Sequence, residues 1–379
     1  MKKILILNYE FPPLGGGAGN ATYYLLKEFS KDNELVIDLV TSSTDNFKIQ
    51  KFSDNITIHF LDINKKNNLH YQSNIDLLLY SWKAYWYCKK LKKRKDFNLI
   101  HAFFGIPCGY LAMKLKRKFD IPYIVSLRGS DVPFYNKRFY WLDKLLFKRL
   151  SRKIWKNARA VITNSEGLKN LAQQTVKKQK IDVIYNGVDI NQFYPNVAFN
   201  QEFTIISTSR LIKRKGINYL LDAFIDFEKK HNNSHLIIVG DGDLKNKLIN
   251  KVSNAYLNSK VTFLGTIKHD DLPNFYQNAD VFILPSLNEG MSNSLLEAMA
   301  SGLAIIATDT GGVKELINEE NGIIINQKNS IDIFNSLEKL YKDRDLLSKM
   351  KKNNREKVFN FSWKKTKEKY KNIYDNFNL

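Results

Sequence analysis

The sequence predicts an α/β protein of two domains, each built around a parallel sheet. The chain has 379 residues, and a domain usually takes roughly 100–200 residues. Short apolar runs alternate with helix-length stretches, and this alternation begins again at Phe203. The short runs are apolar throughout, which is typical of parallel strands that helices cover on both faces.

The first series of elements runs from the N-terminus to Tyr185. The predicted strands are Lys3–Tyr9, Leu35–Val40, Ile56–Ile63, Asn98–Phe103, Tyr123–Leu127, Ala160–Thr163 and Val183–Tyr185. The predicted helices between them are Asn20–Ser30, Tyr71–Lys95, Tyr110–Lys118, Arg138–Lys156 and Glu166–Lys178. We place the first domain at residues 1–184.

The second series begins after Asn191–Gln201, a stretch with Pro195 and no periodicity that is the best candidate for a linker. We predict a helix at Gly216–Lys230 and strands at Phe203–Thr208, Leu236–Val239, Val261–Leu264, Val281–Leu284, Ala304–Ala307 and Gly322–Ile325. The second domain is placed at residues 185–360. The last helix, residues 361–379, is expected to cross back to the first domain.

Composition excludes several protein classes. Hydrophobic residues make up 44% and charged residues 26%, so the chain is neither disordered throughout nor collagen-like. Two cysteines, Cys88 and Cys108, argue against a disulfide scaffold and a cysteine zinc site.

The apolar start of the sequence is too short for a signal peptide, and no apolar run reaches the ~18 residues of a membrane-spanning helix. We expect a cytoplasmic protein that can work on the inner face of the membrane.

The net charge of +21 is concentrated in the first domain. Up to Ile184 there are 33 basic and 15 acidic residues, which leaves +18, and the rest of the chain holds 26 and 23. Two stretches, Lys83–Lys95 and Lys137–Arg159, carry seven and nine of these cations beside aromatic residues. Nucleic acid also attracts such charge, but no nucleic-acid-binding pattern accompanies it.

Three segments carry residues suited to a phosphorylated ligand. Glycines 15–17 follow the first strand and open a helix, which favours an anion or a sugar, although they match neither a dinucleotide fingerprint nor a P-loop. Arg210 and Lys215 flank the end of a strand, where ligands bind in parallel sheets. Two converging cations suit a diphosphate leaving group. In contrast, Lys213 and Arg214 are interpreted as solvated.

The third segment, LPSLNEGMSNSLLEAMASG, follows the predicted strand Val281–Leu284. Small residues lead into a helix whose first N–H groups suit phosphate. Glu289 and Glu297 stand on either side, and their carboxylates would accept hydrogen bonds from sugar hydroxyls. The alternative for Glu297 is a carboxylate that only caps a neighbour on the helix face.

The motifs SRLIKRKG, VGDGD, FLGTI, EGMSNSLLEAMASG and TDTGGVKELI, in this order, resemble glycosyltransferase family 4. The resemblance extends over the whole chain and is strongest between Val183 and Gly322. It implies a GT-B fold, in which two Rossmann-like domains face each other across a cleft. It also implies transfer of a hexose from a UDP- or GDP-sugar with retention of configuration and without metal. We expect a glycan acceptor, lipid-linked, in the synthesis of bacterial surface polysaccharide or glycoconjugate.

The resemblance also implies roles for individual residues. Arg210, Lys215 and Glu289 would be the catalytic residues, with the two cations on the donor diphosphate and Glu289 on the transferred sugar. Glu297 would bind the ribose hydroxyls. The other donor-binding residues would be Gly16, Gly17, Gly240, Thr266, Ile267, Gly290, Met291, Ser292, Asn293 and Ser294.

Three residues of the first domain are expected to contact the acceptor: His101, Arg128 and Asp131. Arg128 departs from the family pattern, because many relatives have histidine before the glycine. An arginine there could bind an anionic group such as a lipid pyrophosphate. For His101 the alternative is a core histidine with both ring nitrogens satisfied.

Asp241-Gly242-Asp243 spells the metal-binding pattern of other glycosyltransferases, but its place between a strand and a helix indicates a turn and a helix cap. No metal and no cofactor beyond the donor are expected. Rival interpretations are a GT-B sugar epimerase or a non-enzymatic basic protein that binds membrane or nucleic acid.

The stretch Arg138–Lys156 has apolar residues near helical spacing with Lys and Arg between them. Two interpretations stay open for this stripe. It packs on the first sheet and leaves a basic rim free, or it lies in the headgroup region of an anionic membrane. The helix Tyr71–Lys95, with Trp82, Tyr85, Trp86 and Tyr87, has the same character.

Overall fold

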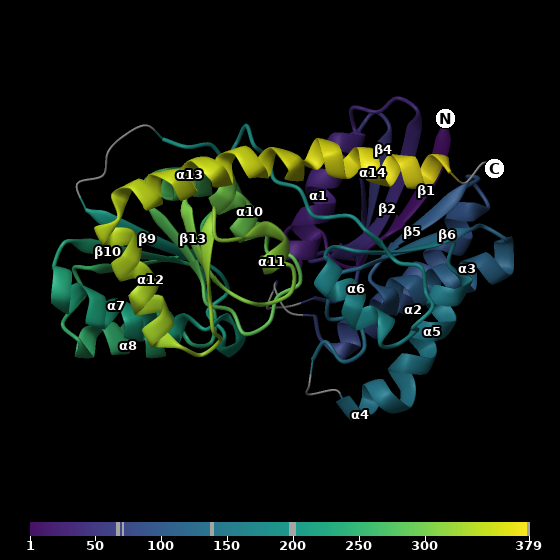
Figure 1. The fold of residues 1–379 in the computed structure, drawn as a ribbon. Helices are drawn as coiled ribbons and strands as arrows, with labels where there is room; N and C mark the ends of the chain where they lie inside the picture. Colours follow the sequence, from purple (N-terminus) through teal and green to yellow (C-terminus); the bar gives the residue numbers. More distant parts are fainter. Residues whose placement is uncertain (66–68, 70–71, 137–139, 197–201, 377–379) are drawn as a thin grey trace. The chain divides into compact units, whose positions relative to one another are not determined.

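The computed structural model describes residues 1–65, 69, 72–136, 140–196 and 202–376. The chain forms two compact units, each with its own sheet (Figure 1). Unit 1 comprises Met1–Asn186 and Trp363–Leu379, and unit 2 comprises Gly187–Ser362. The predicted class, two α/β domains with parallel sheets, is confirmed.

Within the described residues, the sheet of unit 1 has eight strands in the order β3-β4-β2-β1-β5-β6-β7-β8. Every neighbouring pair is parallel except β3 and β4. The strands are β1 (Lys2–Leu7), β2 (Leu35–Ser43), β3 (Lys48–Ser53), β4 (Ile56–Asp62), β5 (Leu99–Phe103), β6 (Tyr123–Leu127), β7 (Ala160–Thr163) and β8 (Asp182–Val183).

Helices cover both faces of this sheet. In Figure 1, α14 (Trp363–Asp375) lies above the sheet of unit 1, and α1 (Gly17–Phe29) packs beside it. Below the sheet lie α2 (Asn74–Lys92), α3 (Tyr110–Phe119) and α5 (Lys148–Asn157). The helix α6 (Glu166–Gln173) precedes β8. The last helix adds Tyr370 and Tyr374 to the core of unit 1.

Two local features of unit 1 were not predicted. Strand β3 was missed because KIQKFS is mostly polar. It is an exposed antiparallel edge strand, and lysines are a common device for protecting such edges. The predicted helix Arg138–Lys156 is confirmed from Tyr140 onward, but it contains a π-helical turn that was not predicted. Its first residues lie outside the described part, and α4 (Tyr140–Leu142) leads through a π-helical turn at Asp143–Phe147 into α5.

The sheet of unit 2 is parallel throughout its described strands, in the order β11-β10-β9-β12-β13-β14. The strands are β9 (Phe203–Thr208), β10 (Ser234–Val239), β11 (Val261–Gly265), β12 (Val281–Leu284), β13 (Ala304–Thr308) and β14 (Gly322–Ile325). The helices are α7 (Ile217–His231), α8 (Lys245–Asn254), α9 (Leu272–Gln277), α10 (Asn293–Ala300), α11 (Val313–Leu316), α12 (Ser330–Lys342) and α13 (Arg344–Val358).

The strand order of unit 2 reverses at β9. From β9 the chain moves outward through β10 and β11, then returns to β12 on the other side of β9. Ligands of open α/β sheets bind beyond the carboxyl ends of the strands at such a reversal. We therefore expect a ligand-binding site at the loops that follow β9 and β12.

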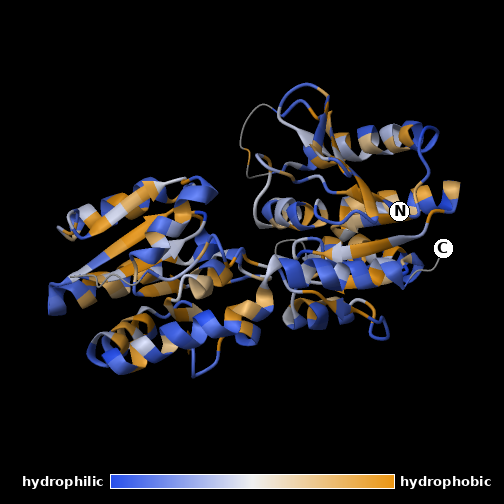
Figure 2. Cartoon of the chain, turned by 90° about the horizontal axis from the view of Figure 1, so that it is seen from above, coloured by the Kyte–Doolittle hydropathy of each residue, from blue (hydrophilic) through white to orange (hydrophobic). Residues whose placement is uncertain are grey.

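Apolar residues concentrate on the strands of both units, while the helices carry many hydrophilic residues (Figure 2). Each sheet is the centre of its own hydrophobic core. Among the helices that the structure describes, none combines the length and the hydropathy needed to cross a bilayer.

Candidate functional site

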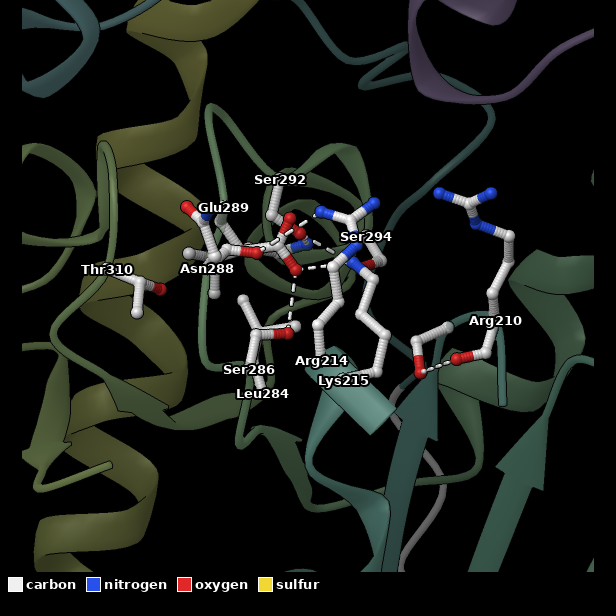
Figure 3. A network of polar contacts seen from close by, with 12 residues as sticks. Arg210, Arg214, Lys215, Leu284, Ser286, Asn288, Glu289, Ser292, Ser294 and Thr310 are labelled. Carbon is white, nitrogen blue, oxygen red and sulfur yellow. Dashed lines mark hydrogen bonds and ion pairs between the residues drawn. The ribbon is translucent and has the colours of Figure 1, made fainter. Parts of the chain in front are cut away.

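The loops after β9 and β12 bring Lys215 and Glu289 into direct contact. Lys215 Nζ donates to Glu289 Oε1, and the Ser286 hydroxyl donates to the same oxygen at 2.7 Å (Figure 3). The side chains of Lys215 and Glu289 are only 14% and 9% exposed. A largely desolvated ion pair thus stands at the reversal point of the sheet.

The two loops are also joined through their backbones. Leu287 N donates to the Arg214 carbonyl at 2.7 Å. Gly216 has a φ of +68°, and a Cβ at this position would stand 2.0 Å from the Pro285 carbonyl oxygen. Only glycine permits this approach, so Gly216 fixes the distance between the loop that carries Lys215 and the loop that carries Glu289.

A third loop, the one that follows β13, packs against the backbone of the loop that carries Glu289. Gly312 N donates to the Gly290 carbonyl at 2.8 Å. Gly311 has a φ of +54°, and its Cβ would stand 2.3 Å from the carbonyl oxygens of Glu289 and Gly290. The TDTGG motif at the end of β13 therefore holds the Glu289 loop through the backbone of Gly311 and Gly312 and through the Thr308 hydroxyl, which donates to the Ser286 carbonyl.

Glu289 is ionised at neutral pH. Burial by itself raises its pKa, but the Lys215 ammonium, the Ser286 hydroxyl and the more distant Arg214 together hold the pKa below its ordinary value. The carboxylate in turn keeps the Lys215 ammonium at a fixed place. Such a fixed cation can stabilise a developing negative charge without reorganisation.

Arg214 belongs to this cluster, although the sequence analysis treated it as solvated. Its side chain is half-buried, its Nη1 donates to the Asn288 carbonyl at 3.5 Å, and its charge acts on Glu289. The 3₁₀ turn Lys213–Lys215 turns Arg214 inward and leaves Lys213 exposed. Sequence spacing gives no sign of this, because three consecutive cations leave open which of them faces inward.

Arg210 lies apart from the ion pair. It is exposed, and Figure 3 shows its side chain standing to one side of Lys215 and Glu289. The loop between Ser209 and Gly216 therefore presents two separate cationic positions, Arg210 on one side and the neighbours Arg214 and Lys215 on the other.

The predicted phosphate segment forms the N-terminus of α10. Ser292 is the N-cap, and its hydroxyl accepts a hydrogen bond from Leu295 N at 3.3 Å and contacts the Ser294 hydroxyl at 3.1 Å. Met291 is buried, whereas Gly290, Asn293 and Ser294 are half-buried. A helix N-terminus directly after the Glu289 loop and near two cations favours an anionic ligand.

Glu297 lies further along α10 in a buried cluster. His269 contacts its Oε1 at 2.9 Å through Nε2, and the Tyr276 hydroxyl donates to its Oε2 at 3.1 Å. Tyr276 also contacts the Thr208 hydroxyl at 2.5 Å. Both carboxylate oxygens thus have protein partners, and their remaining lone pairs are what a ligand hydroxyl could use.

His269 is a residue that the sequence analysis missed. Burial alone would lower its pKa, but the hydrogen bond and charge of Glu297 raise it above the ordinary value. The imidazolium form is therefore favoured and orients Glu297. A histidine among ordinary loop residues gives no signal, because only the fold brings residue 269 to residue 297.

Replacing His269 by glutamine should remove a pH dependence of stability. A raised folded pKa gives stability that is present below the unfolded pKa of about 6.5 and lost as pH rises through the folded value. We expect the wild-type melting temperature to fall between pH 6 and 8 more steeply than that of H269Q. Thermal melts across this range measure the difference.

His235→Gln is the matched control, since His235 Nε2 bonds the neutral Thr262 hydroxyl at 2.9 Å rather than a carboxylate. H235Q should keep the wild-type slope. Equal slopes for wild type and H269Q would contradict the role of the His269–Glu297 pair.

Gly240, Thr266 and Ile267 lie at the ends of β10 and β11. Gly240 has a φ of +131°, a Cβ there would stand 1.9 Å from the Ser209 carbonyl oxygen, and its N–H donates to Gly265 at 2.7 Å. The requirement for glycine at position 240 is therefore explained by contacts within the protein. Thr266 is exposed and Ile267 half-buried, two or three residues before His269.

The predicted turn at Asp241-Gly242 is present, but the predicted helix cap is wrong, because the N-cap of α8 is Leu244 and no side chain caps the helix. Asp241 accepts from Gly242 N at 2.7 Å and pairs with Lys245 at 2.8 Å. Within the part of the chain that the structure describes, no group of three or more His, Cys, Asp or Glu side chains is arranged to hold a metal ion.

The glycine loop of unit 1 is open at Gly16. Gly15 has a φ of +94°, and its N–H donates to Leu69 O at 2.8 Å. Gly16 N donates to Glu10 Oε2 at 3.3 Å, and a Cβ at Gly16 would meet no atom within 4 Å. Helix α1 begins at Gly17. The backbone at Gly16 is therefore accessible to a ligand.

The structure does not support the acceptor role of His101. This residue is fully buried, with Nδ1 against the Tyr374 hydroxyl at 2.7 Å and Nε2 against Ser126 at 2.8 Å. Burial and the nearby Arg128 hold its pKa well below the ordinary value. His101 is a neutral core residue that ties β5 to α14, which is the alternative interpretation.

Arg128 and Asp131 organise the loop after β6. Arg128 lies 4.6 Å from the centre of the Phe103 ring and donates to Asn186 at 2.9 Å. Asp131 accepts from the backbone N–H groups of Arg128 and Gly129, both at 2.9 Å, and of Gly105 at 2.6 Å. Asp131 thus has a structural role in joining two loops.

Two family models together match residues 15–357 of this chain. The model "Glycosyltransferase Family 4" matches residues 15–192, and "Glycosyl transferases group 1" matches residues 189–357. The chain is 30% identical over 308 residues to the Escherichia coli UDP-Gal:alpha-D-GlcNAc-diphosphoundecaprenol alpha-1,3-galactosyltransferase, covering 75% of this chain and 77% of that protein.

A Campylobacter jejuni N-acetylgalactosamine-N,N'-diacetylbacillosaminyl-diphospho-undecaprenol 4-alpha-N-acetylgalactosaminyltransferase is 27% identical over 364 residues, or 93% of each chain. The structure resembles sucrose-phosphate synthase from Thermosynechococcus elongatus with a TM-score of 0.86 at 21% identity, over 99% of both chains. The matching models, the sequence relatives and the GT-B fold agree with the motif order along the chain, and the protein is a member of glycosyltransferase family 4 whose second part matches the group 1 glycosyl transferases.

Proposed function

We propose that this protein moves a hexose from a UDP- or GDP-sugar to a hydroxyl of a lipid-linked glycan, with retention of configuration and without a resident metal. The observation that carries the proposal is the buried pair of Lys215 and Glu289, with Arg214 beside it, at the reversal point of the unit 2 sheet. A nucleotide-sugar diphosphate is a ligand whose negative charge suits this place.

The proposed roles follow the geometry. Lys215, with Arg214 beside it and Arg210 on the other side of the loop, binds the diphosphate, and the N-terminus of α10 faces its oxygens. Glu289 holds Lys215 in place and uses its remaining lone pairs for a hydroxyl of the transferred sugar. Glu297 accepts from the ribose hydroxyls, and the loop at Thr266 and Ile267 contacts the base.

In the proposed step, the acceptor oxygen forms a bond to the anomeric carbon while the bond from that carbon to the phosphate oxygen breaks. The electron pair of the broken bond goes to the phosphate, and the acceptor proton goes to a phosphate oxygen on the same face. The cations stabilise the charge that develops on the leaving group. The departing phosphate is thus the base, and no enzyme nucleophile takes part.

The lipid-linked acceptor is supported by the two sequence relatives, whose names specify diphosphoundecaprenol acceptors. For this chain we propose unit 1 as the acceptor-binding part. Such an acceptor is anchored in a membrane, so we also propose that the protein works as a peripheral protein on the cytoplasmic face.

A donor screen tests the proposal. Purified protein is melted with a panel of UDP- and GDP-sugars, and the sugar that raises the melting temperature is then supplied with a polyprenyl-diphosphate glycan. Transfer to a product with the same anomeric configuration as the donor, undiminished by EDTA, is expected. An inverted product, or an epimerised sugar without any acceptor, would contradict it.

A further inference from the structure

Helix α2 carries apolar residues on its outer face as well as on its inner face. Tyr80, Ala84, Cys88 and Leu91 are buried against the sheet. On the opposite side, a stripe at helical spacing is exposed: Ile75, Leu78, Trp82 and Trp86, at 68%, 70%, 63% and 53%. Helix surfaces that are apolar on more than one side are normally buried, so we expect a binding partner to cover this outer stripe.

The segment from Tyr140 to Asn157 has the same property. Its second half packs into the core through Ile154 and Trp155, as one of the two interpretations of this stripe requires. Its first half does not, because the large apolar side chains there are exposed: Tyr140, Trp141, Leu142, Leu145 and Leu146. The apolar stripe is therefore divided, and only its C-terminal part belongs to the core.

Both apolar stripes lie in the same helical layer. Helix α2 packs beside α3, and α3 packs beside α5, on the side of the unit 1 sheet that faces down in Figure 1. In that view α4 lies beyond α5, further from the sheet. The two stripes therefore flank one layer that has no further element of unit 1 over it among the described residues.

The charge on this layer is of one sign. Six cations lie between Tyr140 and Asn157, and they are Lys144, Lys148, Arg149, Arg152, Lys153 and Lys156. The two acidic residues of α2 and of 140–157 already have partners within unit 1. Asp143 is buried and accepts from Phe134 N at 2.8 Å, and Asp76 pairs with Lys65 at 2.6 Å.

We propose that the exposed stripe of α2 and the exposed side chains of 140–146 form a docking surface for an anionic lipid bilayer. The surface combines aromatic and aliphatic side chains, which suit the headgroup and acyl boundary, with lysines and arginines that attract anionic headgroups. This inference rests on the proposed lipid-linked acceptor and names the part of the chain that meets the membrane.

A protein partner fits these observations less well. A second copy of the chain would bring the same cations against these ones, because a two-fold interface pairs a surface with itself. An acidic protein would match the charge, but Trp and Tyr beside Lys on an exposed helical face is the pattern of a membrane interface. Self-association and protein capture are therefore outcomes that the test must separate.

The test is co-sedimentation with vesicles of phosphatidylglycerol mixed with phosphatidylcholine, and with vesicles of phosphatidylcholine alone. The wild type should bind the anionic vesicles and leave the neutral ones. Three variants follow: the apolar triple W141S/L145S/L146S, the double W82S/W86S, and the charge variant K144Q/K148Q/R149Q. Each cation near an anionic membrane surface contributes ~1 kcal/mol to binding, so each cation removed in the charge variant should weaken partitioning into anionic vesicles about fivefold.

Each apolar variant should reduce partitioning by tenfold or more. The matched control is Y256S/I331S, which removes two exposed apolar side chains of unit 2, 91% and 68% exposed, and should bind like the wild type. Quenching by brominated lipids in a W82F/W86F background checks insertion of Trp141 directly, because the other two tryptophans, Trp155 and Trp363, are buried in the protein.

Several results would overturn the inference: no binding of the wild type to anionic vesicles, equal binding of the apolar variants, or a wild-type dimer that the triple variant dissociates. Failure of the proposed function can be distinguished from failure of the docking surface. The surface variants should keep the donor-induced rise in melting temperature. A wild-type protein that binds no donor but still sediments with anionic vesicles contradicts the proposed function and supports the docking surface.

Discussion

Lys215→Ala is expected to lower kcat/KM for sugar transfer by about a thousandfold. The lost ammonium is the fixed cation for the leaving diphosphate, and removing one such preorganised group costs roughly 10²–10³ in rate. The donor-induced rise in melting temperature should also shrink. Steady-state kinetics and thermal shift with the donor found in the screen measure both effects.

The same change should destabilise the protein, because Glu289 is left buried without its main partner. Breaking a buried pair costs about 3–5 kcal/mol. K215A/E289Q should recover most of that stability without recovering activity, which separates folding from chemistry. Lys213→Ala, in the same turn but exposed, is the matched control and should keep full activity. Wild-type turnover in K215A would refute the site.

Gly216→Ala is expected to abolish activity and to destabilise unit 2. Its Cβ would stand 2.0 Å from the Pro285 carbonyl oxygen. No side-chain rotation can relieve this distance, since the backbone at residue 216 fixes the Cβ and the oxygen belongs to the backbone of Pro285. The loop that carries Lys215 must move away from the loop that carries Glu289. Denaturant unfolding and transfer activity measure the loss.

Gly265→Ala controls for backbone strain. Gly265 has the same φ of +68°, but a Cβ there meets only Lys245 Nζ, at 3.6 Å. It should cost only the left-handed penalty of about 1–2 kcal/mol, with activity retained. If G216A and G265A unfold at the same denaturant concentration with equal activity, the contact with Pro285 does not position the site.

Much of the fold could be predicted from local patterns. Buried parallel strands are continuous apolar runs, so β9, β12 and β13 were found within a residue. The exposed edge strand β3 was missed, since its residues leave only weak apolar alternation. The π-helical turn at Asp143–Phe147 was also missed, because a local change in hydrogen bonding leaves no mark on the apolar spacing.

The candidate site was predictable only where a motif stands within one loop. Glu289 and the N-terminus of α10 follow one strand directly, and Lys215 follows another, so their place at the carboxyl edge could be inferred. Arg214 and His269 could not, because their roles depend on which way a turn faces and on contacts across many residues. His101 shows the reverse case, a polar residue near a strand end that α14 covers.

The sequence by itself determined that this protein is a two-domain α/β glycosyltransferase of family 4 with its excess of cations in the first domain. These properties reside in periodicity, composition and motif order, which are local or additive along the chain. Only the tertiary structure decided which cation faces Glu289, which histidine orients Glu297, and where the apolar stripe of 140–157 leaves the core. Each of these depends on burial, and burial is a property of packed elements, which no single segment specifies.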